Sequence, residues 1–170
     1  MSNIPSTPAD GAVRTSLVTS IADIALPKTA TEVNAASSKE ISCYITAGGF
    51  SFPLSQAAIT DERECDTFVG EAPGRKSISG PTISVIDNTG TPLSATANVA
   101  VDTLVEGTTL YIVRRYGKAF SAAFATADKV DIFKVIVGAK RRIQPEANSV
   151  LRSEYTFFVQ DYRTDVALVA

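Results

Sequence analysis

The chain has 170 residues, of which 45% are hydrophobic and 20% charged, and 16 basic side chains nearly balance 18 acidic ones. This length predicts one domain with its own core, and the charge balance gives no case for a strongly basic nucleic-acid-binding face. Histidine is absent, which removes the commonest general base and metal ligand, so we expect no enzyme centre, no metal and no cofactor.

Residues 1–12 carry Pro5, Pro8 and small polar residues, which predicts an extended N-terminal arm without a core of its own. The arm has neither the basic start nor the apolar stretch of a signal peptide. No run in the chain approaches the 18 apolar residues of a spanning helix. We therefore expect a protein made in the cytoplasm, with no membrane partner. Alternation of apolar and polar residues then predicts a strand at Val13–Val18.

The next segment predicts a short helix and a second strand. Thr29 and Glu32 have the spacing of a capping box, which favours a helix over Glu32–Ala36. Such a helix is too short to be stable alone, so it must pack on the rest of the chain. Ile41–Thr46 alternates like a strand, and the glycine pair at 48–49 breaks the regularity after it.

The stretch from Phe52 to Gly74 is loop-rich and acidic, and two strands projecting as a long hairpin would fit it. Its acids lack the spacing and glycine of an EF-hand calcium loop, and glycoside hydrolysis by a carboxylate pair is a weak alternative. On a strand, Glu62, Glu64 and Asp66 would share one face. We interpret that face as solvated, with a lumen or interface role as the alternative.

The second half of the chain predicts a helix and further strands. Lys76–Ile86 is β-like but contains Pro81, which places it at a sheet edge or a bulge. Helical spacing over Ala97–Glu106 ends at Gly107. Three strands follow, at Thr108–Arg115, Lys129–Gly138 and Ser149–Gln160. Residues 161–170 are predicted to be a C-terminal arm, which leaves 13–160 as a single β-sandwich domain.

Two basic runs interrupt this half of the chain. Aromatic residues are too few to interleave with them for nucleic-acid stacking, so we interpret them as solvated strand ends or intersubunit salt bridges. The candidate intersubunit residues are Arg114, Arg115, Lys140, Arg141 and Arg142. Cys43 and Cys65 make a poor zinc site without histidine. We predict buried reduced thiols, and a single bridge between them stays open.

These elements predict a mainly β fold, an antiparallel β-sandwich or barrel with one flanking α-helix. An open sheet leaves strand edges that are templates for pairing with another copy. The pattern therefore indicates a self-associating subunit without a visible reactive centre.

Several phrases of the sequence resemble the major tail protein, or tail tube protein, of long-tailed phages that infect actinobacteria. They read SNIPSTPADGAVR, EISCYITAGGFSF, TDERECDTFVGEAPGR and QPEANSVL. The resemblance covers nearly the whole chain and implies a virion tail protein that assembles in the host cytoplasm as stacked six-membered rings. By position it assigns ring stacking or the lumen to Gly48, Gly49, Phe50, Asp61, Glu62, Glu64 and Asp66.

The resemblance also implies partners and a physical mechanism. Tape measure, tail terminator and baseplate proteins would contact the tube, and double-stranded DNA would pass through its lumen without specific binding. Because Lys and Arg hold DNA by charge, we expect a lumen of acidic and small polar residues. Three alternatives stay open: a tail terminator or head–tail joining ring, a virion-surface sugar-binding β-domain, and a hydrolase with two carboxylates.

Overall fold

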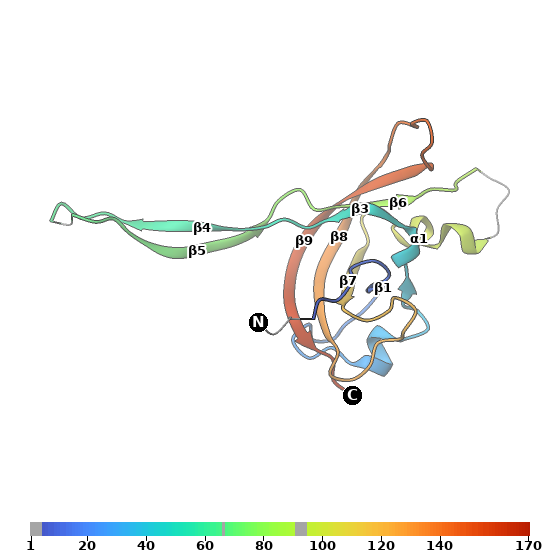
Figure 1. Ribbon diagram of the computed structural model, residues 1–170, viewed down its shortest axis with the longest axis horizontal. Helices are drawn as coiled ribbons and strands as arrows, with labels where there is room; N and C mark the ends of the chain where they lie inside the picture. The colour runs from blue at the N-terminus through green and yellow to red at the C-terminus, as the bar shows by residue number, and fades with distance from the viewer. Residues whose placement is uncertain (1–4, 66, 91–94) are drawn as a thin grey trace.

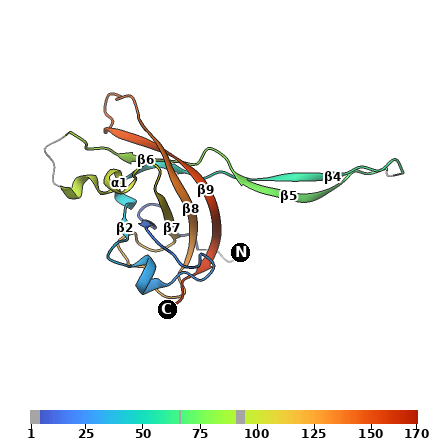
Figure 2. The same ribbon diagram turned by 180° about the vertical axis from the view of Figure 1, so that it is seen from behind.

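The computed structural model describes residues 5–65, 67–90 and 95–170. Within them, seven strands form one antiparallel sheet of order β2-β1-β7-β8-β9-β6-β3, which curls into a half-barrel (Figure 1). Two further strands, β4 and β5, form a separate hairpin that projects far from the sheet, and Figure 2 shows it from behind. The strands are β1 (Val13–Val18), β2 (Lys39–Glu40), β3 (Ile45–Ser51), β4 (Leu54–Asp61), β5 (Gly70–Ile78), β6 (Thr82–Ile86), β7 (Thr109–Tyr116), β8 (Lys129–Arg142) and β9 (Arg152–Ala167).

Helical segments are short and lie beside the sheet. They are a π-helix at Thr29–Val33, 3-10 turns at Ser42–Tyr44 and Ala95–Asn98, and the helix α1 at Val99–Thr103. The fold class is therefore confirmed as mainly β, antiparallel, with one small flanking α-helix. The sheet takes the barrel-like form of that prediction, because its strands curl around one side of the molecule (Figure 1).

The central strands β7 and β8 carry buried apolar side chains on both faces. On one face, Leu110 and Val135 pack in a cluster that Ala100 and Leu104 of the α1 region complete. On the other face, Ile132 packs in a second cluster with side chains from the 21–33 segment and from the C-terminal end. Each fully buried aliphatic side chain contributes roughly 1.5–3 kcal/mol, so these two clusters hold the half-barrel together.

Strand predictions were accurate where residues alternate clearly. The strand at Val13–Val18 is confirmed, and the strands predicted at 108–115 and 129–138 are β7 and β8 with shifted ends. The last predicted strand was too short, because β9 continues to Ala167 and stays paired with β8. Its final residues are mostly polar, since this part of the strand is exposed on one face. The division of the chain into two arms and one domain stays a prediction.

The predicted strand at Ile41–Thr46 is wrong over its first half. Ser42–Tyr44 forms a 3-10 turn instead, and β3 begins only at Ile45. Side-chain bonds explain the difference: the Ser42 hydroxyl accepts the Thr15 N–H at 2.8 Å, and the Ser42 N–H donates to the Glu40 carboxylate at 2.6 Å. Such local bonds compete with the ladder bonds of a strand.

Both predicted helices exist in altered form. The predicted Thr29–Glu32 capping box does not form, because the helix lies earlier, at Thr29–Val33, with Lys28 as its N-cap. The Glu32 carboxylate instead accepts the Lys28 N–H at 2.7 Å. The Thr29 hydroxyl donates to the Val169 carbonyl at 2.8 Å and ties the helix to the C-terminal end. The helix α1 covers only five residues of the predicted 97–106, because its β-branched residues are weak helix formers.

Candidate assembly surface

The β4–β5 hairpin is the most exposed element of the protein. Among the described residues its strands bond to each other and to no other strand, from the Leu54–Ile78 pair to the Asp61–Gly70 pair. All eight residues of β4 are exposed. An isolated two-stranded ribbon is marginally stable in water, so this hairpin has the character of a binding element. The projecting hairpin fits the prediction for this stretch of the sequence.

A bulge near the middle of the hairpin explains why the segment GEAPGRKS, residues 70–77, can contain both Pro73 and Gly74 within a strand. The register shifts between Gln56 and Ala58, and a Cβ atom on Gly74 would lie 2.8 Å from the Ala57 carbonyl oxygen. Pro73 is tolerated beside this bulge, where the ladder is interrupted. The segment therefore continues as strand β5 past the bulge.

The acidic residues lie at the tip of the hairpin. Asp61 ends β4 and forms an exposed ion pair with Arg63 at 3.0 Å, worth at most about 1 kcal/mol. Glu62 and Glu64 lie in the connection to β5, so the predicted strand face for these acids is wrong. Asp66 lies outside the described residues.

Exposed apolar side chains accompany these carboxylates at the tip. Phe68 is 82% exposed, and its neighbour Val69 is exposed as well. An aromatic ring in water at the end of a projecting ribbon is a typical anchor for a protein contact. The tip therefore combines an apolar anchor with negative charge.

The two cysteines do not form a bridge within the described subunit, and both are exposed, so the prediction of buried thiols is wrong. Cys43 lies in the 3-10 turn beside the sheet, whereas Cys65 lies at the hairpin tip. Eight residues of strand separate the tip from the base of the hairpin by roughly 27 Å. A disulfide needs Cα atoms within about 7 Å, so these cysteines cannot pair inside one subunit.

Gly48, Gly49 and Phe50 shape the edge strand β3. Gly48 has φ +69°, and a Cβ atom on Gly49 would lie 2.8 Å from the Ser84 carbonyl oxygen, so both positions require glycine. The Phe50 ring stacks on Phe52 with 4.6 Å between centroids. These contacts show that all three residues stabilise the conformation of β3 within the subunit. Their role in ring stacking or in the lumen stays a prediction.

Arg115 is not available to a neighbouring subunit. It is 1% exposed, pairs with Asp128 at 2.9 Å, and donates to the carbonyl oxygens of Ala119, Ala122 and Ala123. The structure therefore removes it from the intersubunit candidates, because its charge is satisfied within its own subunit. An adjacent arginine, Arg114, stacks on the Phe50 ring at 3.9 Å from the centroid. Burial lowers the pKa of Arg114, against the opposing effects of Tyr116 and Asp131.

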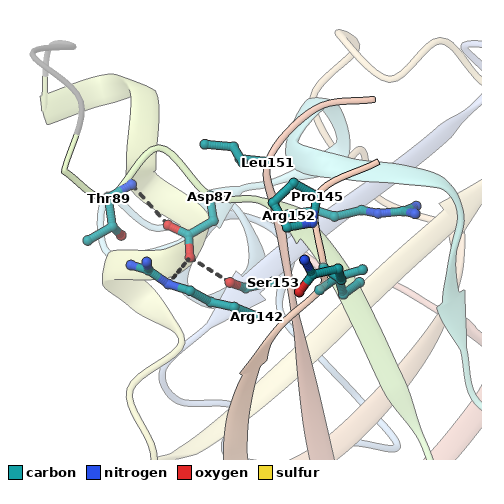
Figure 3. Close-up of a pocket in the computed structure, with 9 residues that line it drawn as sticks. Asp87, Thr89, Arg142, Pro145, Leu151, Arg152 and Ser153 are labelled. Carbon is teal, nitrogen blue, oxygen red and sulfur yellow. Dashed lines mark hydrogen bonds and ion pairs between the residues drawn. The ribbon is translucent and has the colours of Figure 1, made fainter. Parts of the chain in front are cut away.

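The last residue of the second basic run, Arg142, lines a pocket of about 300 Å³ beside the β8–β9 turn (Figure 3). Lys140 pairs with Asp87 at 2.7 Å, and Arg141 pairs with Glu154 at 2.6 Å. The Nε atom of Arg142 lies 4.0 Å from Asp87. Lys140 and Arg141 thus pair within the subunit, which leaves Arg142 as the least engaged member of the run.

Asp87 anchors the floor of this pocket. Its carboxylate accepts the Ser153 hydroxyl at 2.5 Å and the Thr89 N–H at 2.9 Å, besides the Lys140 ion pair. Burial by itself raises the pKa of Asp87, but the bonds from Lys140, Ser153 and Thr89 together outweigh it and hold the pKa well below its ordinary range. Asp87 is therefore ionised at neutral pH and fixes the geometry of the pocket.

Replacing Asp87→Asn is expected to cost about 1–3 kcal/mol of unfolding free energy at pH 7, because the buried donors lose a charged acceptor. The folded-state pKa lies below the unfolded value of about 3.9. The stabilisation is thus complete above pH 5 and fades as the pH falls below that value. Urea unfolding at pH 7, 5 and 3 checks this. A cost that stays constant down to pH 3 would contradict it, and Glu154→Gln at a more exposed ion pair is the control.

Comparison with known proteins decides the family. A sequence profile described as "Phage tail tube protein" matches residues 1–170. The chain belongs to the phage tail tube protein family. Family membership makes it a structural component of a phage tail. No curated protein matches it significantly.

The fold of this tail tube protein also occurs in a solved assembly. One similar chain is in the structure described as "Cryo-EM structure of the anti-feeding prophage (AFP) baseplate, 6-fold symmetrised". Its sequence is 12% identical to that of the tail tube protein, and the two folds compare with a TM-score of 0.53. The match covers 94% of this chain and 96% of that one. At this identity the likeness shows the fold alone. Within the described part of the tail tube protein, no helix is long and apolar enough to cross a membrane, and no group of three potential metal ligands gathers.

Sequence reasoning missed the open edge of the tail tube protein's longest strand. The pairing of β6 with β9 ends at Thr156, so from Phe158 to Ala167 the described part of β9 has a neighbouring strand, β8, on one side alone. Phe158 is exposed on this segment. Such an edge is a template for another strand. No local sequence signal marks it, because it depends on where a distant strand stops pairing.

Proposed function

We propose that this tail tube protein builds the tail tube of a long-tailed phage of actinobacteria. Six copies close into a ring, and rings stack around a lumen through which double-stranded DNA leaves. The observation that carries this proposal is the β4–β5 hairpin, which extends away from its own sheet and leaves both its strands exposed. Such an extension gains stability by contacting another subunit.

Ring closure is supported by the strand edges of the half-barrel. One side of β9 beyond Phe158 has no strand beside it among the described residues, and β3 forms one edge of the sheet. A strand of a neighbouring copy can satisfy these backbone groups and close a ring by a heterologous contact. The solved structure with the similar fold belongs to a baseplate described as 6-fold symmetrised, which supports six subunits to a ring.

The proposed mechanism is physical rather than catalytic. DNA binds wherever unpaired Lys or Arg side chains present charge, and Arg115, Lys140 and Arg141 are already paired with acids of their own subunit. This pairing supports passage of DNA without specific binding. Assembly takes place in the host cytoplasm, and the finished protein lies in the virion tail. Its partners there are the tape measure, tail terminator and baseplate proteins.

Negative-stain electron microscopy of the purified protein at rising concentration tests the proposal. We expect rings with a central hole that stack into tubes as concentration increases. Single rings that never stack would overturn the tube and favour a terminator or head–tail joining protein. A monomer at every concentration, even after addition of sheared phage tails as initiators, would overturn self-assembly altogether.

A further inference from the structure

The hairpin tip and the pocket beside the β8–β9 turn are complementary surfaces of the same chain. We propose that this pocket receives Phe68 from the hairpin tip of a second copy, while Arg142 pairs with the tip carboxylates Glu62 and Glu64. The inference rests on the proposed function and adds to it the receptor into which the hairpin docks. The pocket is lined in part by Asp87, Arg142, Ile143, Pro145, Leu151 and Ser153.

The tip supplies the side chain that needs burial. Phe68 is the most exposed large hydrophobic residue of the described chain, and Val69 beside it is also exposed. Burying an exposed aromatic ring favours association, and aromatic residues are enriched at the cores of interfaces. Phe68 is left uncovered by the described residues of its own subunit, so the stabilisation is available to a neighbour.

The pocket supplies a matching apolar wall. Ile143, Pro145 and Leu151 line one part of it, and Leu151 remains exposed in the isolated subunit. Its volume of about 300 Å³ lies at the small end of the range for ligand pockets, roughly 300–1,000 Å³. This size suits one aromatic side chain better than a large cofactor. Figure 3 shows Leu151, Pro145 and Asp87 around the same opening.

Charge favours the same pairing. The Arg142 side chain is 69% exposed, and the Asp87 carboxylate lies 4.0 Å from it and is already bound by Lys140 at 2.7 Å. Arg142 therefore keeps most of its donors for another partner. At the tip, Glu62 and Glu64 have no ion-pair partner among the described residues, whereas Asp61 is held by Arg63. The free cation and the free carboxylates lie on separate surfaces that one contact would join.

The hairpin cannot fill the pocket of its own subunit. The tip lies roughly 27 Å of strand from the base of the ribbon, and the ribbon points away from the β8–β9 turn in both views (Figures 1 and 2). The contact therefore joins two copies. Because tip and pocket are different surfaces, the contact is heterologous, and repetition of it produces a continuing array rather than a closed pair.

Site-specific photo-crosslinking tests the contact directly. Phe68 is replaced by the analogue p-benzoylphenylalanine, the assembled protein is irradiated, and linked peptides are identified by mass spectrometry. We expect intermolecular links from position 68 to the segment 142–153. Links to other segments in normal tubes would overturn this pocket and leave the proposed function standing. Failure of the unmodified protein to form tubes would instead count against the proposed function.

A charge exchange provides a second test that does not depend on the analogue. Arg142→Glu is expected to raise the protein concentration needed for tube formation at least tenfold. Combining it with Glu62→Arg and Glu64→Arg should restore most of the loss, because the ion pairs are rebuilt with opposite sense. The control Lys28→Glu makes the same charge change at an exposed position away from the pocket. Equal effects of Arg142→Glu and Lys28→Glu, or no restoration, would overturn the proposal.

Discussion

Shortening the β4–β5 hairpin is expected to abolish tube formation while the rest of the protein folds normally. Residues 55–77 are replaced by Asn-Gly, a sequence that favours a tight turn, between Leu54 and Ile78, which already face each other in the ladder. The deletion removes no side chain of either core cluster. The free energy of unfolding should therefore fall by no more than about 1 kcal/mol, as for other surface changes. Electron microscopy and thermal unfolding measure the two effects.

The control for this deletion keeps the length of the ribbon. Gln56→Ser with Lys76→Ser changes two facing exposed residues and should leave tubes intact. If the shortened protein still forms tubes at the same concentration, the hairpin does not join subunits. If it fails to fold, the hairpin contributes to the half-barrel in a way that its exposure does not suggest.

Asp128→Ala is expected to cost about 3–5 kcal/mol of unfolding free energy, since it leaves the buried Arg115 without its counter-charge. The carboxylate bonds Arg115 at 2.9 Å, accepts the Ala125 N–H at 3.0 Å and also pairs with Lys118. Burial raises the pKa of Asp128, but the bonds from Lys118, Ala125 and Arg115 outweigh it and lower the pKa overall. Because a whole domain is stabilised by only about 5–15 kcal/mol, this loss is large.

Urea unfolding followed by circular dichroism measures this effect, and Lys118→Ala is its control. The Lys118 side chain is 58% exposed, so removing it should cost about 1 kcal/mol or less. Equal losses from Asp128→Ala and Lys118→Ala would show that the buried pair is not the dominant contribution. Replacing both Arg115→Met and Asp128→Leu should recover part of the stability, because no buried charge is then left alone.

Most of the fold could be predicted from local pattern. Alternation located β1 and β7, and an apolar run located β8. The loop-rich, acidic stretch before Gly74 indicated a pair of strands projecting from the core. The predictions that failed depend partly on contacts between distant residues. The Ser42 turn depends on bonds to Thr15 and Glu40, and the first of these joins residues that are distant in the sequence. Periodicity alone cannot report such a bond.

The candidate site was harder to predict for the same reason. Asp87 and Ser153 are 66 positions apart and meet because β6 pairs with β9. The sequence predicted that Arg115 is solvated or bound to a neighbouring subunit, because it follows Arg114 in a short basic run. In the fold, its side chain instead enters the loop at 119–128 and bonds its carbonyl oxygens. Sequence identified the charged residues, but it could not assign each of them to the interior or to a neighbour.

The bare two-stranded ribbon also bears on when assembly begins. Ordering its backbone costs about 1–2 kcal/mol for each residue, and the isolated subunit buries almost none of β4 in return. Under the proposed function, when two free subunits associate, a single contact must offset most of the entropy cost of ordering the hairpin. A subunit that joins a completed ring meets preformed receptors instead. Growth on an existing template is then much faster than spontaneous initiation, so polymerisation has a lag phase and a threshold concentration.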